Sequence, residues 1–286
     1  MSPRAAFAVL AIALLARPLE ASEPVRVTTL VETTAVGPQR IFVARIDLRH
    51  PGVDLRVSGP VAPRPGDPKG TEARLESVTE FARRVGATLA INGNFYARLP
   101  GAPSHWTAGQ PVALVGPSVS EGRVVSHANR KGLGHPALLV TRDRRAEIKC
   151  ALEKDLAGKD DVVAGVSHSG TRGCLLLENG KNSGEKASPS LRARHPRTAA
   201  GLTRDRRELI LVVVDGRRPG WSIGMTLSEL GALMLRLGAH TAINLDGGGS
   251  SSFLYRPARG AEVTNRPSDG GWRPVANQLA VVLRAR

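Results

Sequence analysis

The chain has 286 residues, of which 41% are hydrophobic and 23% charged, a composition typical of a globular protein rather than a disordered one. Aromatic residues make up only 3%, which argues against a single-stranded nucleic-acid binder that depends on stacked rings. The formal net charge of +15 favours contact with anionic polymers, although a general preference for arginine, spread along the chain, explains it without any partner.

The N-terminal segment has the pattern of a secretory signal. Arg4 precedes an unbroken apolar run over residues 5–16, which is shorter than the roughly 20 residues that span a bilayer. Ala21 offers a small residue at a suitable cleavage point. We therefore predict a signal peptide over residues 1–21, a secreted or periplasmic protein and no stable membrane span. If the segment stays uncut, the protein would be loosely tethered instead.

The segment after the signal is predicted to form strands. Apolar and polar residues alternate over residues 41–48, and residues 53–57 are the expected neighbouring strand. Prolines at positions 60, 63, 65 and 68 then predict a loop. Because this stretch is too short to fold alone, we predict that residues 22–70 are strands and a proline-rich loop packed on a main domain, residues 71–286, within a single-domain protein.

Helical spacing of apolar residues predicts a helix over residues 71–85, ended by Gly86, and a buried strand over residues 87–91. Further along, residues 137–140 and 146–150 predict a hairpin.

The two cysteines, Cys150 and Cys174, lie 24 positions apart. Neither belongs to a C-x-x-C or Cys/His cluster, which argues against a zinc site or a redox motif. Export would allow them to form one structural disulfide, and two buried free thiols are the alternative.

A strand pair is predicted over residues 198–203 and 208–215. A capping box beginning at Thr226 then opens a helix that runs to residue 237, and residues 242–245 predict another buried strand. This succession favours an α+β (mixed α/β) fold, with a twisted mixed β-sheet and at least two packed helices.

Two carboxylates follow the strands that flank this helix. If these strands pair directly in parallel, Asp215 and Asp246 leave the same edge of the sheet, where open α/β sheets bind ligands. An ion pair with a nearby arginine is the alternative explanation for Asp215.

The chain also contains a short internal sequence repeat. Residues 86–92 and 238–244 agree at five of seven positions, and each segment follows a predicted helix and ends in an asparagine, Asn92 or Asn244. Either common residues at equivalent positions produce this match by chance, or two helix–strand units deliver both asparagines to one site.

The run from Asn244 to Ser252 carries the sharpest chemical signal. Three successive glycines, Gly247, Gly248 and Gly249, permit positive φ and let backbone amides surround an anion. Ser250 and Ser251 add hydroxyl groups, and Asp246 supplies a carboxylate. The run matches neither the Rossmann nor the P-loop glycine pattern, and a plain glycine-rich turn is the alternative.

Other candidate residues are weaker when taken singly. Arg197 and Thr198 open a strand after a polar loop, and an arginine there suits bidentate binding of phosphate. Asn265 and Arg273 lie in a polar loop before the last predicted strand, residues 278–283. The histidines are scattered, with no spacing typical of a metal site or a Ser-His-Asp triad.

Taken together, these segments resemble the phosphodiester glycosidase domain family over roughly residues 85–283. The resemblance is carried by Ala90-Ile91-Asn92-Gly93-Asn94-Phe95-Tyr96, Arg197-Thr198-Ala199-Ala200-Gly201, Val212-Val213-Val214-Asp215-Gly216-Arg217, Gly224-Met225-Thr226-Leu227-Ser228-Glu229-Leu230, Asn244-Leu245-Asp246-Gly247-Gly248-Gly249-Ser250, Asn265-Arg266-Pro267 and Arg273-Pro274-Val275-Ala276-Asn277. Asn94 departs from the family pattern, which has a second glycine there.

The resemblance implies hydrolysis of a sugar-1-phosphodiester, with an α-N-acetylglucosamine 1-phosphodiester as one candidate substrate. We predict Asp246 and Asp215 as catalytic carboxylates. The predicted substrate-binding residues are Asn92, Asn94, Arg197, Thr198, Asn244, Gly247, Gly248, Gly249, Ser250, Ser251, Asn265 and Arg273.

The expected partner is a phosphorylated carbohydrate and not a nucleic acid. The predicted hydrolysis requires no cofactor. The sequence leaves open whether a divalent cation, Ca²⁺ or Mg²⁺, lies near Asp246. The oligomeric state is also open. A non-catalytic module that binds an anionic envelope polysaccharide is the main alternative function.

Overall fold

The computed structural model describes residues 23–128, 134–167 and 174–284. The predicted signal peptide, residues 1–21, lies outside these residues. The described strands form four sheets, of seven, five, five and three strands. Every strand pairing among them is antiparallel.

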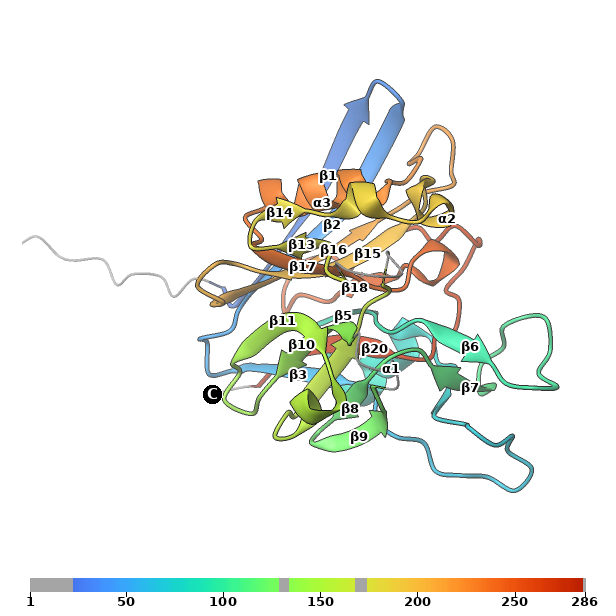
Figure 1. Ribbon diagram of the computed structural model, residues 1–286. Coiled ribbons are helices and arrows are strands. Elements are labelled where there is room, and N and C mark those ends of the chain that lie inside the picture. The colour runs from blue at the N-terminus through green and yellow to red at the C-terminus, as the bar shows by residue number, and fades with distance from the viewer. Residues whose placement is uncertain (1–22, 129–133, 168–173, 285–286) are drawn as a thin grey trace, which may run out of the picture.

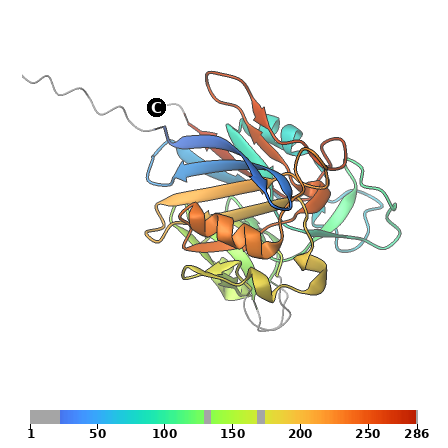
Figure 2. The same ribbon diagram turned by 90° about the horizontal axis from the view of Figure 1, so that it is seen from above.

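The largest sheet lies beneath a helix, as Figures 1 and 2 show. In spatial order its strands are β1 (Val25–Thr34), β2 (Gly37–Asp47), β16 (Glu208–Val214), β15 (Arg197–Leu202), β17 (Thr241–Asn244), β13 (Leu177–Glu178) and β14 (Lys181–Asn182). Helix α3 (Leu227–Arg236) packs on one face, and the remaining sheets lie on the other side.

This arrangement explains the continuous apolar run of β16. Ile210, Val212 and Val214 pack into the core beneath α3, whereas the alternate side chains enter the core on the opposite face. A strand of an antiparallel sheet is therefore apolar on both sides when both faces are covered.

The predicted α+β class with a mixed sheet is wrong. The described part of the chain is mostly antiparallel sheet and has two helices longer than one turn, α3 and α1 (Val78–Val85). The strands that flank α3 do not pair directly, because β15 lies between β16 and β17 and is antiparallel to both. The pattern strand–helix–strand was correct, but the sequence does not show that the preceding strand occupies the place between them.

A second sheet lies against α1. Its strands, in order, are β19 (Val263–Thr264), β18 (Phe253–Tyr255), β5 (Leu89–Asn92), β20 (Gln278–Leu283) and β3 (Val53–Val57). Val78, Phe81 and Ala82 of the helix pack into the core formed with this sheet.

Two further sheets, of five and three strands, complete the described fold. One has the order β11 (Ala146–Ala151), β10 (His135–Val140), β12 (Asp161–Ala164), β8 (Ser118–Ser120) and β9 (Arg123–Ser126); the other has β4 (Ala73–Arg74), β7 (Pro111–Leu114) and β6 (Tyr96–Arg98). The short helical turns are η1 (Glu153–Leu156), η2 (Gly184–Lys186), η3 (Gly248–Ser250) and α2 (Pro189–Arg192).

Both longer helices begin at capping boxes. In α3, the predicted pair is present, since Thr226 accepts from the amide of Glu229. The other helix starts later than predicted because Ser77 and Glu80 form a capping box and the preceding residues belong to β4. It ends at Gly86, which adopts the left-handed conformation with φ of 68°.

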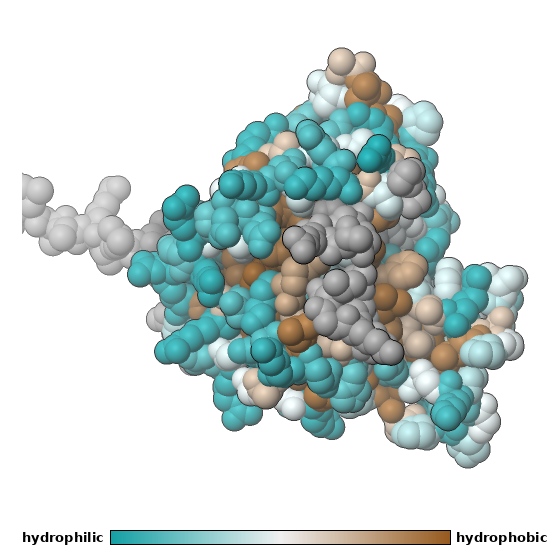
Figure 3. Space-filling view, in the orientation of Figure 1, coloured by the Kyte–Doolittle hydropathy of each residue, from teal (hydrophilic) through white to brown (hydrophobic). Residues whose placement is uncertain are grey.

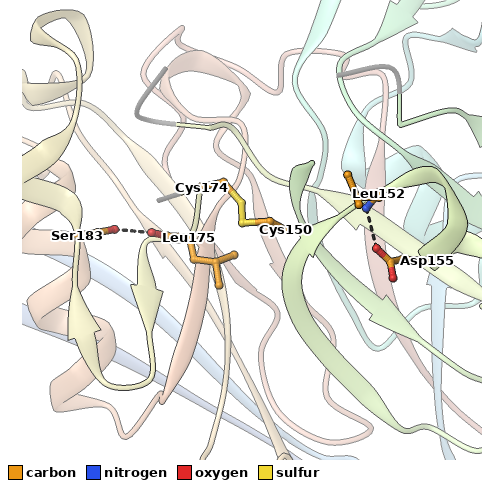
Figure 4. The surroundings of a disulfide bond; sticks show 6 residues. All are labelled: Cys150, Leu152, Asp155, Cys174, Leu175 and Ser183. Carbon is orange, nitrogen blue, oxygen red and sulfur yellow. Dashed lines mark hydrogen bonds between the residues drawn. A yellow bond between two sulfur atoms is a disulfide. The ribbon is translucent and has the colours of Figure 1, made fainter. Parts of the chain in front are cut away.

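A disulfide joins Cys150 of β11 to Cys174, which lies three residues before β13 (Figure 4). The two Cα atoms are 6.1 Å apart, within the ordinary range for such a bond. It ties the sheet of β11 to the segment that enters the seven-stranded sheet.

The hairpin of β1 and β2 projects from the rest of the molecule, and its tip carries exposed apolar side chains, Val31 and Val36 (Figures 1 and 3). Among the described residues, no helix has the length and apolar character needed to cross a bilayer.

Candidate functional site

Three neighbouring strands bring their site residues to one edge of the large sheet. Because β15 is antiparallel to β16 and β17, it begins where the other two strands end: Arg197 pairs with Val214, the last residue of β16, and Ala199 pairs with Asn244, the last residue of β17. Asp215 and Asp246 follow those strands. Beside this edge is a cavity of about 230 Å³, called here the Asp246 hollow. It is lined by Phe95, Tyr96, Trp106, Val166, Leu191, His195, Arg197, Arg217, Asn244, Leu245, Asp246, Gly247, Gly248, Gly249, Ser250 and Arg273.

Asp246 is the one acidic residue among the described residues that line this hollow. Its side chain is buried, and desolvation raises the pKa of its carboxyl from 3.8 to about 7. Hydrogen bonds from the Ser250 hydroxyl and the Gly247 amide, and the charge of Arg273, oppose this rise. The carboxylate therefore exchanges its proton near neutral pH, as an acid or base of catalysis must.

Arg197 brings a buried positive charge to the same hollow. It is 3% exposed, and its guanidinium donates to the carbonyl oxygens of Met225 (2.9 Å), Leu191 (2.8 Å) and Ala193 (2.8 Å). No carboxylate among the described residues forms an ion pair with it. Burial, with the charge of Arg217, lowers its pKa to about 10. A buried cation without a counterion is a good receptor for an anionic ligand.

Arg217 and His195 stand beside this cation and were not among the predicted site residues. The Arg217 Nη2 lies 3.2 Å from the His195 Nδ1, and both side chains line the hollow. Arg217 has a φ of 58°, which is strained for a residue with a side chain. Its position directly after Asp215-Gly216 in the family-like segment was the available signal.

Asn92 holds the backbone of the Asp246 loop by hydrogen bonds. It is fully buried, and its Nδ2 donates to the carbonyl of Asp246 at 2.6 Å. Its Oδ1 accepts from the Thr198 hydroxyl at 2.8 Å and from the Ser252 amide at 3.0 Å. Asn92 and Thr198 thus fix the backbone that carries Asp246, and neither lines the hollow.

Asn244, in contrast, belongs to the lining of the hollow. The residue is 3% exposed, and its Oδ1 is buried with no hydrogen-bond partner among the described residues. A buried amide oxygen of this kind costs free energy unless a ligand donates to it.

Two of the three glycine amides are bonded within the protein. The Gly248 amide donates to the carbonyl of Pro196, and the Gly247 amide bonds to Asp246. Close packing favours glycine at the first position, because a Cβ at Gly247 would lie 2.9 Å from the Pro196 carbonyl oxygen. The second glycine also adopts a φ of 61°.

The two serines differ in position. Ser250 lines the hollow and bonds to Asp246, whereas Ser251 lies outside it, with a buried hydroxyl that has no partner among the described residues.

Asp215 does not line the hollow. Its Oδ2 accepts from the Trp221 indole at 2.9 Å, its Oδ1 accepts from the Asn265 Nδ2 at 2.9 Å, and both oxygens accept from the Arg266 amide. Burial raises its pKa, and these hydrogen bonds oppose the rise. Asp215 and Asn265 therefore anchor two loops rather than face a ligand.

Asn94 also lies outside the hollow, whereas Arg273 lines it. The Asn94 Nδ2 points to the carbonyls of Val115, Gly116 and Pro117, and its Oδ1 accepts from the Ala164 amide at 2.7 Å. Arg273 donates through Nε to Asp269 at 2.9 Å.

An aromatic wall faces the charged residues. Tyr96 and Trp106 meet edge to face with ring centroids 4.9 Å apart, and Phe95 beside them is 46% exposed. Burial and the nearby Asp246 raise the pKa of Tyr96 to about 12, so its hydroxyl stays protonated. Tyr96 and Phe95 belong to the Asn92–Tyr96 segment that the resemblance quoted; nothing in the local sequence pointed to Trp106.

Among the described residues, no three His, Cys, Asp or Glu side chains are grouped as a metal site. Asp246 is surrounded by hydrogen-bond donors and arginines.

The hollow therefore has three parts: a buried carboxylate, a cluster of cations and a wall of rings. Such a site suits a ligand with one anionic end and one end that presents both apolar faces and hydroxyl groups. Residues 85–282 match the family described as phosphodiester glycosidase, and the chain belongs to that family.

The most similar curated relatives found include N-acetylglucosamine-1-phosphodiester alpha-N-acetylglucosaminidase of Bos taurus and of Homo sapiens. They are 28% and 26% identical to this chain over 221 residues, or 73% of it. The match spans 39% and 40% of those proteins, so the chain corresponds to about two fifths of their length.

A similar solved structure is the zebrafish N-acetylglucosamine-1-phosphodiester alpha-N-acetylglucosaminidase catalytic domain, auto-inhibited by its pro-peptide. It has a TM-score of 0.66 and 20% identity, over 93% of this chain and 85% of that one. This likeness concerns the fold.

Proposed function

We propose that this protein is a hydrolase that cleaves the bond between a sugar and the phosphate of a sugar-1-phosphodiester, and that the reaction takes place in the Asp246 hollow. The observation that carries the proposal is a buried carboxylate and a buried guanidinium without a counterion in one cavity. The family and the names of the two mammalian relatives support the same chemistry, with an α-N-acetylglucosamine 1-phosphodiester as the first substrate to try.

In this proposal the cations hold the phosphodiester. Arg197 offers a planar, fixed guanidinium, and Arg217 adds a second positive charge at the mouth of the hollow. Phosphate oxygens would replace the counterion that Arg197 lacks. Charge-assisted hydrogen bonds of this kind are about twice as strong as neutral ones.

The sugar would lie between the aromatic wall and Asn244. The faces of Tyr96 and Trp106 suit the apolar face of a pyranose ring, and the Asn244 Oδ1 accepts from a sugar hydroxyl or amide N–H.

Asp246 would be the catalytic carboxylate. Ionised, it removes a proton from a water molecule as the water oxygen attacks the anomeric carbon. The bond between that carbon and the phosphate oxygen breaks, and its electron pair leaves with a phosphate monoester. Because this leaving group is already a stable anion, no second carboxylate is needed as an acid. Asp215, held by four hydrogen-bond contacts outside the hollow, is assigned a positioning role.

We also propose that the protein is exported. The apolar N-terminal run supports a signal peptide, and the Cys150–Cys174 disulfide suits an oxidising compartment. Comparing the intact mass of the mature protein with that of the full chain tests the cleavage.

The enzymatic proposal is tested by assaying purified protein on α-N-acetylglucosamine 1-(methyl phosphate) and on the matching glucose and galactose diesters. We expect release of free sugar and methyl phosphate. Asp246→Asn and Arg197→Gln should each lose at least 100-fold in kcat/KM, whereas Arg123→Gln, an exposed arginine outside the hollow, should keep full activity. Binding without turnover by the unmodified protein would instead favour a non-catalytic carbohydrate-binding module.

A further inference from the structure

A pentapeptide occurs twice in the chain and makes the same kind of turn each time. Thr-Arg-Asp-Arg-Arg stands at residues 141–145, between β10 and β11, and again at residues 203–207, between β15 and β16. The catalytic proposal uses neither copy.

The two turns share their internal contacts. In each, the threonine hydroxyl donates to the aspartate Oδ1, at 2.5 Å for Thr141 and 2.6 Å for Thr203. The fourth residue adopts the left-handed conformation, with φ of 63° at Arg144 and 56° at Arg206. Its amide donates back to the threonine carbonyl, at 2.8 and 2.9 Å respectively. The backbone conformation of the two turns is therefore the same, and the arginines of each turn start from equivalent backbone positions.

The turns lie side by side and enclose a cavity of about 360 Å³, called here the twin-turn hollow. It is lined by Leu48, Arg49, Asp143, Arg144, Arg145, Ala146, Asp205, Arg206 and Arg207. The segment at Leu48 joins them, since its amide donates to the Arg207 carbonyl at 2.9 Å and its carbonyl accepts from the Arg144 Nε at 3.2 Å.

The lining of this hollow is strongly basic. Five of its residues are arginines and two are aspartates. The two aspartates form ion pairs with Arg145 and Arg207 of their own turns, and Arg49 pairs with Asp47. The side chains of Arg49, Arg145 and Arg207 remain 62%, 86% and 62% exposed. Because exposed ion pairs are weak, these guanidinium groups can exchange their carboxylate partners for an anionic ligand in solvent.

The twin-turn hollow is at the far end of the strands from the catalytic site. Arg197 begins β15 at the Asp246 hollow, and the turn at 203–207 follows the end of that strand, about 20 Å away at 3.3 Å per residue. A small substrate cannot touch both places, but a polymer can.

We propose that the twin-turn hollow is a binding site for a polymer with phosphodiester links along its backbone, which holds a macromolecular substrate while its sugar-1-phosphodiester unit occupies the Asp246 hollow. The assignment of the polymer as substrate rests on the proposed function. Arginine forks bind phosphate oxygens in pairs, and two adjacent turns give regularly placed cations for a chain with repeated charges.

The test measures binding of poly(glycerol phosphate) to the full protein between 50 and 200 mM NaCl. The variant is Arg49→Gln/Arg145→Gln/Arg207→Gln, which leaves both left-handed positions unchanged. The matched control is Arg123→Gln/Arg236→Gln/Arg259→Gln, which removes the same charge from exposed positions outside the hollow. We expect the variant to bind about 10- to 100-fold more weakly, with a shallower salt dependence, and the control to lose less than threefold.

An equal loss in the control would show that net charge alone binds the polymer and would overturn the proposal. So would equally tight binding of polygalacturonate or of anionic phospholipid vesicles. Turnover of α-N-acetylglucosamine 1-(methyl phosphate) should be the same in variant, control and unmodified protein. If none of the three turns over this substrate, the proposed enzymatic function fails, and the binding result still decides whether the hollow holds such a polymer.

Discussion

The two helix–strand units of the protein carry nearly the same sequence and use it differently. In each, a capped helix is followed by Gly-Ala, two variable residues and Ala-Ile-Asn. The asparagine is Asn92 after α1 and Asn244 after α3. Both asparagines lie beside the Asp246 loop. The structure thus agrees with convergence of the two units on one site.

The difference lies in what surrounds each amide. Asn92 donates to the Asp246 carbonyl and accepts from Thr198 and Ser252, so its side chain is committed to the protein. The Asn244 Oδ1 is buried without a partner among the described residues, and Asn244 belongs to the lining of the hollow. The Asn92 amide therefore stabilises the loop, and the Asn244 amide oxygen is available to a ligand.

The largest effect is expected when the Asp246 carboxylate is replaced. Asp246→Asn keeps the shape of the side chain but cannot remove a proton from water, so kcat should fall about 1,000-fold. In the unmodified enzyme, kcat/KM should rise with pH up to about 7, the pKa of Asp246, and level off above it. A steady-state pH profile checks both; a profile that falls over this range would contradict a basic role.

The same substitution should stabilise the fold in alkaline solution. Because folding raises the Asp246 pKa from 3.8 to about 7, the native state keeps a proton that the unfolded chain loses between these values. Stability present at pH 4 is therefore lost as the pH rises through 7. Urea unfolding should show Asp246→Asn to be a few kcal/mol more stable than the unmodified protein at pH 8, with little difference at pH 4.

Asn92→Ala should be the more disruptive of the two asparagine substitutions. It leaves three buried groups without their partner, at about 1 kcal/mol or more each, so the free energy of unfolding should drop by about 3 kcal/mol. Urea denaturation measures this. If Asn244→Ala costs as much stability, the distinction between a structural and a ligand-binding amide is wrong.

Asn244→Leu should affect activity more than stability. It replaces a buried oxygen that has no partner in the described protein with an apolar group of similar size, so the free energy of unfolding should change by less than about 1 kcal/mol. We expect kcat/KM to fall roughly 10-fold, mainly through KM, because a contact to the sugar is lost. Unchanged kinetics would remove Asn244 from the site.

The smallest effect is expected at Thr198, whose hydroxyl donates to the Asn92 Oδ1. Thr198→Val removes one hydroxyl bond, while the Asn92 Oδ1 keeps the Ser252 amide. A loss of about 1 kcal/mol in unfolding free energy, with kcat nearly unchanged, would fit this role. A much larger fall in kcat would place Thr198 closer to the substrate than the structure does.

Local sequence predicted the elements that short-range chemistry controls. The capping box at Thr226, the left-handed Gly86, the hairpin of β10 and β11 and the buried strand β16 all depend on residues close together in the chain. The loop that carries Asp246 could be recognised for the same reason, since its three glycines and the serines after them are consecutive in the sequence.

The site was predicted in part. Arg197, Asn244, Asp246, Ser250 and Arg273 do line one hollow, as do the three glycines, of which the amides of Gly247 and Gly248 are bonded within the protein. Asp215, Asn94 and Asn265 are buried in hydrogen-bond networks behind it. A polar residue at a strand end has the same sequence signal whether it faces a cavity or a loop.

By itself, then, the sequence determined that two longer helices are each followed by a buried strand, and which segments carry charge and glycine. Only the tertiary structure decided that β15 lies between β16 and β17, which makes the sheet antiparallel and separates Asp215 from Asp246. It also decided that Tyr96, Trp106 and Arg217 meet at the hollow. The physical reason is that strand neighbours and cavity walls are chosen by burial and hydrogen bonding between distant residues, which no short window of sequence contains.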